Sequence, residues 1–520
     1  MRKIFFYLNL SVLALIGISA VFFFYFTAED SYITYRYAEN WVDTGSLVYN
    51  QGEPINAMTS PLHAVLSAAL YLATGKTVIA NKIVSIILLF ISALLVWSRY
   101  REYPHLQALS LILLIPPSVL LWTFGGLETP ILLFLATITM ILVLGRPPFR
   151  LDVLCAIFLL AGLAFLTRYD SILFFLPVIL YVISKASSMK QVLIALGVGA
   201  IMPLAWFFTS IFYYGDLLPT SFYVKTPKVN LWGVIHNAKY IASYLLFIGT
   251  IPVAALVIAL LVPKRGTIEV LYRHFKSLWW LYLGLLLEIL YGLTIATHHM
   301  MFSFRFFVPY IPSSVLLMVD LLRHATETRE VDLAKGRPAY LFTGFLLSLM
   351  IFQLYQSVYT YNNSVNGISS IGEYRALGIR EYAGFIQLLK QEALDIENHW
   401  NMIKGDGEGR PRIITFAAGM LPYAYRESYI YEKLVSYRHC HERYSQGLYA
   451  DYIHIVAPRL GQVEEQLPRS EDSYFLVSSY ELLFDGSMQR FLVYYNPMPE
   501  PHNLSAGIYD HCEQLEYDAN

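Results

Sequence analysis

Charged residues are scarce in this chain. Asp, Glu, Lys and Arg account for 14% of its 520 residues, whereas soluble domains carry about a quarter. Hydrophobic residues reach 56%, and the mean hydropathy is +0.48. These values exclude an ordinary soluble domain and predict a polytopic membrane protein. Excess positive charge is also absent, because the formal net charge is −1. This balance argues against a nucleic-acid partner, which would need a basic surface.

Cysteines are few, and so are signs of repetition. The chain has 3 cysteines. Cys155 lies in an apolar segment, while Cys440 and Cys512 lie in the polar C-terminal region, and no pair has the spacing of metal ligands. A zinc site is therefore not supported. A disulfide between Cys440 and Cys512 stays open, because spacing does not show whether their Cβ atoms are close. Internal repeats and low-complexity linkers are not visible.

Long apolar segments dominate the first two thirds of the chain. The first, 4–26, follows Arg2 and Lys3 and is long enough to cross a bilayer. It is longer than a signal-peptide core and has no small-x-small cleavage site before Glu29, so we expect a retained helix. Stretch 60–74 is ambiguous: as a span it would reverse the side of everything after it, and the distribution of charge favours a helix along the outer membrane surface. The predicted spans are 4–26, 78–98, 106–124, 130–145, 151–166, 172–184, 192–213, 237–262, 277–297, 307–323 and 339–358.

The distribution of positive charge predicts the orientation. With 60–74 on the surface, the loops on the N-terminal side hold roughly twice as many Lys and Arg as the opposite loops, which places the N-terminus in the cytoplasm. About eleven spans then put the C-terminus outside. We expect a transmembrane module over 1–358, with a first outer loop at 27–77, and an extracytoplasmic α/β or α+β domain over 359–520. In that domain a helix at 373–398 is predicted to precede strands near 412–419, 474–478 and 491–495.

The outer loops carry charges at the level of the membrane surface. Glu29 and Asp30 directly follow the first span, and charge at this depth is costly unless it is paired or used. Arg and Lys bind phosphate oxygens, and a carboxylate near a hydroxyl can act as a general base. This combination favours sugar transfer from a polyprenyl phosphate. The structural alternative is that the arginines are interfacial anchors paired with carboxylates. The other charged loop residues are Arg36, Glu128, Arg168, Asp170, Asp216, Lys225 and Arg305.

Several motifs, in order, resemble the GT-C superfamily of polyprenyl-phosphate-dependent membrane glycosyltransferases. The similarity is greatest to the branch that contains terminal arabinofuranosyltransferases. The first outer loop reads Glu-Asp-Ser-Tyr-Ile-Thr-Tyr-Arg-Tyr over 29–37, followed by the Gly-rich stretch 45–53 and Thr59. Later motifs match at 126–130, 168–170, 214–225 and 305–309, and residues 418–423 resemble a segment of the family's outer domain.

The resemblance implies a function and a set of site residues. It implies a polyprenyl-phosphate sugar donor, a cell-envelope glycan or lipid acceptor, and inversion at the outer, periplasmic face of a bacterial inner membrane. The first of the family's two aspartates is Glu29 here, so Asp30 is the favoured base, with Glu29 and Glu128 as alternatives. No cofactor is implied, and use of a divalent metal stays open. The implied residues for donor phosphate and sugar are Arg36, Tyr37, Asn50, Glu53, Arg168, Asp170, Asp216, Lys225 and Arg305.

Two other function classes remain open from the residues. One is a transporter or lipid flippase, since prolines interrupt several spans, although no repeat pairs them. The other is a non-catalytic membrane protein whose outer domain binds a partner. Glu288 lies near the middle of a predicted span, and we expect it to be hydrogen-bonded within the bundle or to line a wet cavity.

Overall fold

The described residues form two compact units. The computed structural model describes residues 2–145, 147–224, 231–247, 253–257, 267–295, 303–329, 331–362, 379–404, 409–415, 417–432, 450–457, 475–484 and 487–495. The first unit comprises Met1–Phe26, Lys82–Ala205 and Pro227–Ile379. The second comprises Thr27–Asn81, Trp206–Thr226 and Arg380–Asn520. The predicted boundary at 358 stays a prediction.

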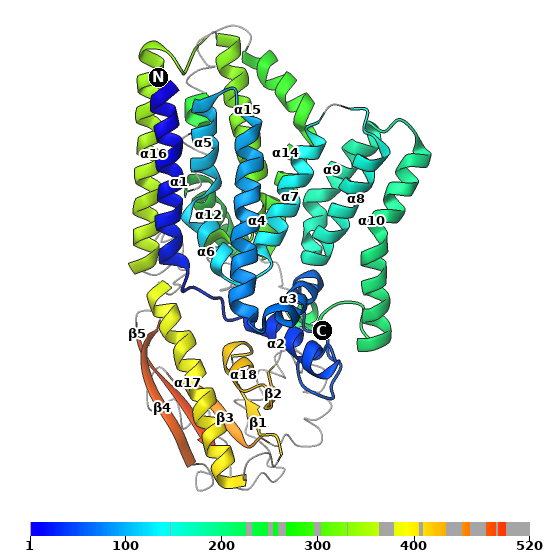
Figure 1. Cartoon of the computed structure of the whole chain (residues 1–520), viewed down its shortest axis with the longest axis vertical. Helices are drawn as coiled ribbons and strands as arrows, with labels where there is room; N and C mark the ends of the chain where they lie inside the picture. Colours follow the sequence, from blue (N-terminus) through cyan, green and yellow to red (C-terminus); the bar gives the residue numbers. More distant parts are fainter. Residues whose placement is uncertain are drawn as a thin grey trace. The chain divides into compact units, whose positions relative to one another are not determined.

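Apolar helices make up the first unit (Figure 1). Within the described residues, 5 helices are long and apolar enough to cross a membrane, or up to 6 if a bent pair counts as one span. The chain is therefore a multi-pass membrane protein. The helices, with their full extents, are α1 (Arg2–Phe23), α4 (Thr77–Arg99), α5 (Pro104–Leu114), α6 (Pro117–Phe124), α7 (Thr129–Val143), α8 (Leu151–Thr167), α9 (Ile172–Ser184), α10 (Met189–Thr209), α12 (Leu231–Phe247), α14 (Thr267–Ile295), α15 (Ile311–Arg329) and α16 (Gly336–Asn362).

The bent pair corrects one predicted span. Segment 106–124 is not one helix, because α5 and α6 meet at an angle of 55°. Pro116 and Pro117 lie at the break, where they lack the N–H groups that a continuous helix would need. Of predicted span 237–262, the structure describes only part of α12 and residues 253–257. The total of eleven spans stays a prediction.

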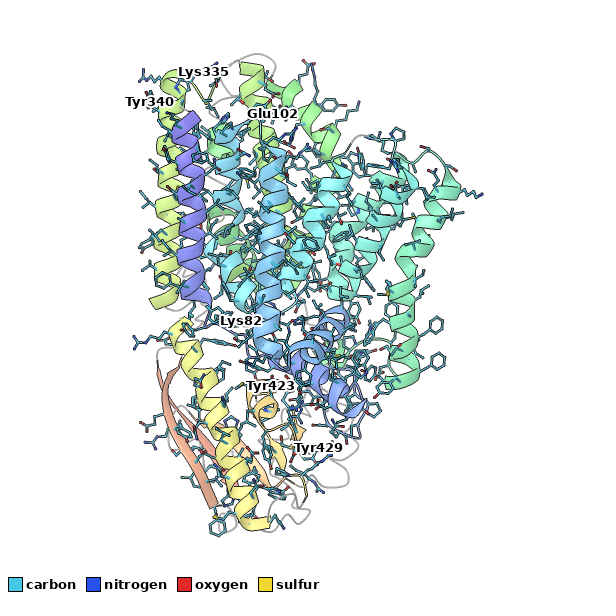
Figure 2. All side chains as sticks on the ribbon, viewed as in Figure 1. Lys82, Glu102, Lys335, Tyr340, Tyr423 and Tyr429 are labelled. Atoms are coloured by element: carbon cyan, nitrogen blue, oxygen red, sulfur yellow. The ribbon has the colours of Figure 1, made fainter. Side chains whose placement is uncertain are left out.

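Charged residues mark the two ends of the first unit. Lys335 and Glu102 lie at one end of the helices and Lys82 lies toward the other (Figure 2). Which end faces the cytoplasm stays a prediction.

The second unit contains a mixed sheet and the residues of the first outer loop. The sheet order is β2-β1-β3-β5-β4, in which β1 pairs in parallel with β2 and β3, and β5 pairs antiparallel with β3 and β4. Helix α17 packs on this sheet through Phe385 against Phe491 and through Trp400 against Tyr452. The elements are α2 (Ser31–Thr44), α3 (Pro61–Thr74), α11 (Thr220–Val224), α17 (Ile379–Lys404), α18 (Met420–Ala424), β1 (Arg412–Ile414), β2 (Tyr429–Tyr431), β3 (Tyr452–Ala457), β4 (Phe475–Phe484) and β5 (Ser487–Tyr495).

Candidate functional site

Four of the predicted site residues meet in the first unit. Glu128, Arg168, Asp170 and Arg305, here called the Glu128 cluster, come from three separate loops. Glu128 Oε1 accepts a hydrogen bond of 3.1 Å from each of the two arginines. Asp170 receives two bonds from Arg168, through Nε at 3.1 Å and Nη2 at 2.7 Å. The cluster thus holds two cations and two carboxylates.

Local backbone geometry delivers these side chains. Glu128 is the N-cap of α7, and Arg168 is the C-cap of α8, where the chain turns into a 3-10 turn at Tyr169–Ser171. Just before Arg305, Ser303 and Phe304 have φ values of 49° and 58°. Non-glycine residues seldom adopt this left-handed region, and strained backbone of this kind gathers at functional sites. The strain therefore singles out the Arg305 loop.

Burial makes the Glu128 cluster electrostatically strong. The side chains of Glu128, Arg305 and Arg168 are 3%, 8% and 17% exposed. Burial alone would lower the pKa of Arg168, but Asp170 and Glu128 more than offset this and raise it. The guanidinium of Arg305 also lies 5.3 Å from the ring centre of Trp122. Charge in such surroundings interacts strongly with any further ion that enters.

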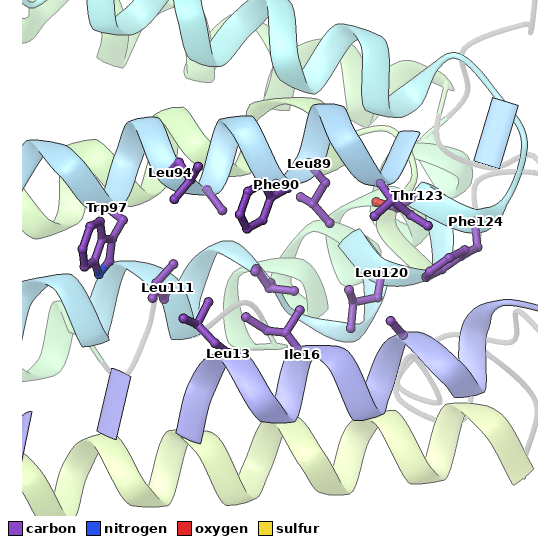
Figure 3. A pocket seen from close by; sticks show the side chains of 14 residues that line it. Leu13, Ile16, Leu89, Phe90, Leu94, Trp97, Leu111, Leu120, Thr123 and Phe124 are labelled. Carbon is purple, nitrogen blue, oxygen red and sulfur yellow. The ribbon is translucent and has the colours of Figure 1, made fainter. Parts of the chain in front are cut away.

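A buried lysine and an apolar groove accompany the cluster in the same unit. Lys82 Nζ donates to the carbonyl oxygens of Phe24 at 2.6 Å and Phe26 at 2.8 Å. One turn further along α4, Ile86 lines an apolar pocket of about 190 Å³ between α1, α4, α5 and α6 (Figure 3). The pocket also reaches Phe124, four residues before Glu128. Sequence analysis did not place Lys82 among the site residues; its signal was a lone lysine in an apolar helix.

Glu29 and Asp30, here called the carboxylate pair, lie in the second unit and have contrasting environments. Glu29 Oε1 accepts hydrogen bonds from the backbone N–H groups of Gly419 and Met420, the second at 3.1 Å. The backbone N–H of Glu29 donates to the hydroxyl of Tyr382 at 2.8 Å. Asp30 is the N-cap of α2 and is half-buried. Among the described residues, no hydrogen bond or ion pair reaches the Asp30 carboxylate.

The surroundings of Glu29 favour the protonated form of its side chain. Burial, followed by the neighbouring Asp30, raises the pKa of Glu29 to about 8, although the Gly419 and Met420 N–H groups act in the opposite direction. Glu29 therefore holds a proton more readily than an ordinary glutamate. A pair in which one carboxyl keeps its proton is suited to acid–base catalysis. In this pair, the Asp30 carboxylate has fewer hydrogen bonds within the described residues and is the candidate base.

Residue 419 can only be glycine in this arrangement. A Cβ atom there would overlap the carbonyl oxygen and the carboxylate of Glu29. The run 418–423, noted in the sequence as a family-like segment, therefore includes a close contact with the carboxylate pair. Sequence reasoning did not include Gly419 or Tyr382 among the site residues, because their distance from Glu29 along the chain hides the contact.

Four other predicted donor-binding residues hold the second unit together. Arg36, which is 1% exposed, donates to the carbonyl oxygens of Tyr49, Pro422, Arg426 and Ser428. Tyr37 donates to Ile55, Asn50 pairs with the backbone of Ile430, and Glu53 accepts from the Tyr429 hydroxyl. These contacts connect the first outer loop to residues 422–430, so we assign these residues to the scaffold of the site.

The remaining predicted residues can be placed in part. The Asp216 carbonyl oxygen accepts a bond of 2.7 Å from Ser210 Oγ. Lys225, Cys440 and Cys512 lie outside the described residues. Glu288 is 1% exposed and lines a mostly apolar cavity of about 650 Å³ in the first unit, so the expectation of a wet cavity or a hydrogen bond within the bundle stays a prediction. Within the described ranges, no group of three or more His, Cys, Asp or Glu side chains could hold a metal ion.

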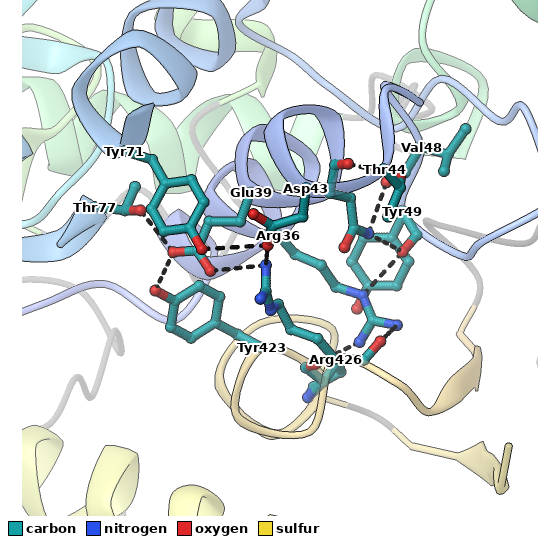
Figure 4. A network of polar contacts seen from close by, with 12 residues as sticks. Arg36, Glu39, Asp43, Thr44, Val48, Tyr49, Tyr71, Thr77, Tyr423 and Arg426 are labelled. Carbon is teal, nitrogen blue, oxygen red and sulfur yellow. Dashed lines mark hydrogen bonds and ion pairs between the residues drawn. The ribbon is translucent and has the colours of Figure 1, made fainter. Parts of the chain in front are cut away.

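A network of polar contacts around Glu39 was not predicted (Figure 4). Glu39 Oε1 accepts from the hydroxyls of Thr77 and Tyr423, each at 2.6 Å, and Glu39 Oε2 lies 3.1 Å from Arg426. Arg426 also contacts Asp43 at 2.8 Å. All of these groups belong to the second unit, and they connect α2 to Thr77, to α18 and to the segment after α18. The network therefore stabilises the surroundings of the carboxylate pair.

Comparisons with known proteins support the fold. No family model matches the sequence, and none of the curated proteins is significantly similar to it. The chain resembles the crystal structure of ArnT from Cupriavidus metallidurans bound to undecaprenyl phosphate, with a TM-score of 0.55, 12% identity, and coverage of 93% of this chain and 97% of that chain. The apo state of ArnT gives a TM-score of 0.53, at 12% identity over 92% and 97% of the two chains. The oligosaccharyltransferase of Archaeoglobus fulgidus gives 0.49, at 11% identity over 88% and 70%. The chain thus has the overall fold of ArnT.

Proposed function

We propose that this protein is a GT-C membrane glycosyltransferase. It transfers a sugar from a polyprenyl-phosphate donor to a glycan or lipid of the cell envelope, at the outer face of a bacterial inner membrane. The observation that carries the proposal is the likeness to ArnT, which extends over 93% of this chain and was found in a structure bound to undecaprenyl phosphate. The motifs in the outer loops support the same reaction class.

Asp30 is proposed as the general base. Its carboxylate has no partner among the described residues, while Glu29 beside it is held by two N–H groups. In the reaction, Asp30 takes the proton of an acceptor hydroxyl, and the hydroxyl oxygen attacks the anomeric carbon of the sugar. The bond from that carbon to the phosphate oxygen breaks, and the polyprenyl phosphate leaves with the electron pair. One displacement of this kind inverts the anomeric centre.

The leaving phosphate needs cations, and three cations of the first unit are candidates. Arg168 and Arg305 share Glu128, and Lys82 uses two carbonyl oxygens. We propose that Lys82 and Arg305 bind the donor phosphate, because bonds from a cation strengthen as negative charge develops on departure. The apolar groove beside Lys82 is proposed to hold the isoprenoid chain. The hydrocarbon chains of lipids are abundant in a membrane and match the apolar lining of this groove.

The test is a binding and transfer assay on the purified protein in lipid nanodiscs. Undecaprenyl phosphate is expected to raise the melting temperature, and undecaprenol without the phosphate is not. Lys82→Met should abolish the shift, whereas Lys335→Met, at the opposite end of the helices (Figure 2), should keep it. A panel of polyprenyl-phosphate sugars is then tested for transfer and for release of polyprenyl phosphate. Equal shifts with and without the phosphate, and no turnover with any donor, would reject the proposal.

A further inference from the structure

A buried polar relay crosses the second unit. It consists of Glu392 on α17, His454 on β3 and Thr415 just after β1. The side chains of Glu392 and His454 are fully buried, with Glu392 Oε2 3.1 Å from His454 Nε2. The other ring nitrogen, Nδ1, lies 3.0 Å from Thr415 Oγ1. Apolar residues of similar volume often stabilise a core as well as a buried ion pair does. Stability alone therefore does not explain the three polar side chains of the relay, which indicates a further role for them.

The relay continues to the carboxylate pair through four residues of backbone. The Ala417 N–H donates to Thr415 Oγ1 at 3.0 Å. The Ala418 carbonyl oxygen accepts from the Tyr49 hydroxyl. The N–H groups of Gly419 and Met420 then hold the Glu29 carboxylate. Because there is no space for a Cβ atom between residue 419 and Glu29, a shift of segment 417–420 would displace Glu29.

We propose that Thr415, held by His454 and Glu392, is a positioning residue for sugar transfer. It fixes segment 417–420, so that two amides hold Glu29 beside the base Asp30. This inference rests on the proposed function. Other titratable groups near Glu29 are Tyr32, Tyr49, Tyr382 on α17 and Glu432 after β2.

The Thr415 hydroxyl is the critical group, because it contacts both His454 and the backbone of segment 417–420. Its oxygen accepts from the Ala417 N–H, and it shares a hydrogen bond with His454 Nδ1. Thr415→Val keeps the shape but removes the hydroxyl, which leaves two buried polar groups without this partner. Thr415→Ser keeps the hydroxyl. The two variants therefore separate the hydrogen bond from the volume of the side chain.

The experiment combines hydrogen exchange with kinetics on the full-length protein in nanodiscs. Thr415→Val should speed amide exchange in 417–420 about tenfold and lower kcat about tenfold, with KM for the donor unchanged, because misplaced groups can cost up to about a hundredfold in rate. Thr415→Ser should restore both values. His454→Gln should act like Thr415→Val. The control is His399→Gln, since His399 Nδ1 contacts only the Tyr452 hydroxyl, at 2.8 Å, among the hydrogen bonds of the described residues.

Two results would overturn the inference. Exchange of 417–420 that stays at the wild-type rate in Thr415→Val would show that the hydroxyl does not fix the segment. Faster exchange with unchanged kcat would show that the segment does not position the reacting groups. If the wild-type protein transfers no sugar from any donor, the proposed function fails, and the exchange comparison still decides whether Thr415 fixes the segment.

Discussion

Asp30→Asn tests the proposed base most directly. The substitution keeps the shape of the side chain and removes its basicity. A positioned general base contributes about 10²–10⁴ in rate, which corresponds to roughly 2.7–5.4 kcal/mol of barrier at about 1.36 kcal/mol per tenfold. We expect kcat to fall by this factor. Because no described residue bonds the Asp30 carboxylate, the free energy of unfolding should change by less than about 0.5 kcal/mol.

The same substitution also acts on Glu29. The charge of Asp30 is one cause of the raised pKa of Glu29, which is about 8. In Asp30→Asn this repulsion disappears, so the pKa of Glu29 should fall toward its ordinary value. Any remaining activity that depends on Glu29 as a substitute base should then develop at lower pH than about 8. The pH profile of the residual rate therefore reports on the neighbour as well as on the base.

The assay is transfer from a polyprenyl-phosphate sugar by purified protein, with melting temperature measured in parallel. Asp43→Asn is the matched control, because Asp43 lies on the same helix, its side chain is 37% exposed, and it contacts Arg426. An exposed ion pair of this kind contributes up to about 1 kcal/mol, and turnover should not change. If Asp30→Asn keeps more than about a tenth of wild-type turnover, Asp30 is not the base, and Glu29 or Glu128 becomes the candidate.

Three further predictions concern charge and orientation. The pKa of Glu29 is raised from 4.5 to about 8, so between these pH values the folded state keeps a proton that the unfolded state loses, and the stabilisation from Glu29 falls as pH rises. Glu29→Gln should flatten that part of a plot of melting temperature against pH. A plot for Glu29→Gln that runs parallel to the wild-type plot would contradict the raised pKa. Arg305→Lys keeps the charge but loses the fork of donors, so kcat should fall at unchanged melting temperature. The control Arg323→Lys, which alters an arginine with a similar ring contact and Glu partner, should transfer at the normal rate. Equal rates for the two variants would exclude Arg305 as a ligand of the donor phosphate. A reporter active only outside the cytoplasm should work after Thr360 and fail after Arg329, and cytoplasmic signals from both would reject the topology.

Sequence patterns predicted the elements better than their interruptions. The apolar runs identified helices because burial in a membrane demands apolar length, and the short stretch 60–74 is a helix of 14 residues, α3. The break between α5 and α6 lies at Pro116 and Pro117, where prolines were noted as interrupting a span, but hydropathy does not predict the angle between the two helices. The sheet was foreseen as strands but not as a mixed order, because register depends on partners far apart in the chain.

The candidate site shows the same division. Pairing of the arginines with carboxylates is what the alternative of interfacial anchors predicted, because charge at membrane depth is too costly to remain unpaired. Arg168 and Arg305 show this pairing through Glu128, and their role in binding phosphate stays a prediction. The partners of Arg36 could not be anticipated, because carbonyl oxygens carry no sequence signal. The four carbonyls that surround this guanidinium belong to residues 49, 422, 426 and 428.

The arrangement around Arg36 has a consequence for biosynthesis. Arg36 and its acceptor Ser428 are 392 residues apart. At about 5–20 residues per second, a ribosome needs roughly 20–80 s to cover that distance. Throughout this interval the nascent first loop has already emerged, yet its arginine must stay hydrated and its helix α2 must wait for the segment that completes it. A ribosome that stalls before residue 422 would leave a chain with its membrane helices made and this loop unfinished, which gives quality-control proteases a clear target.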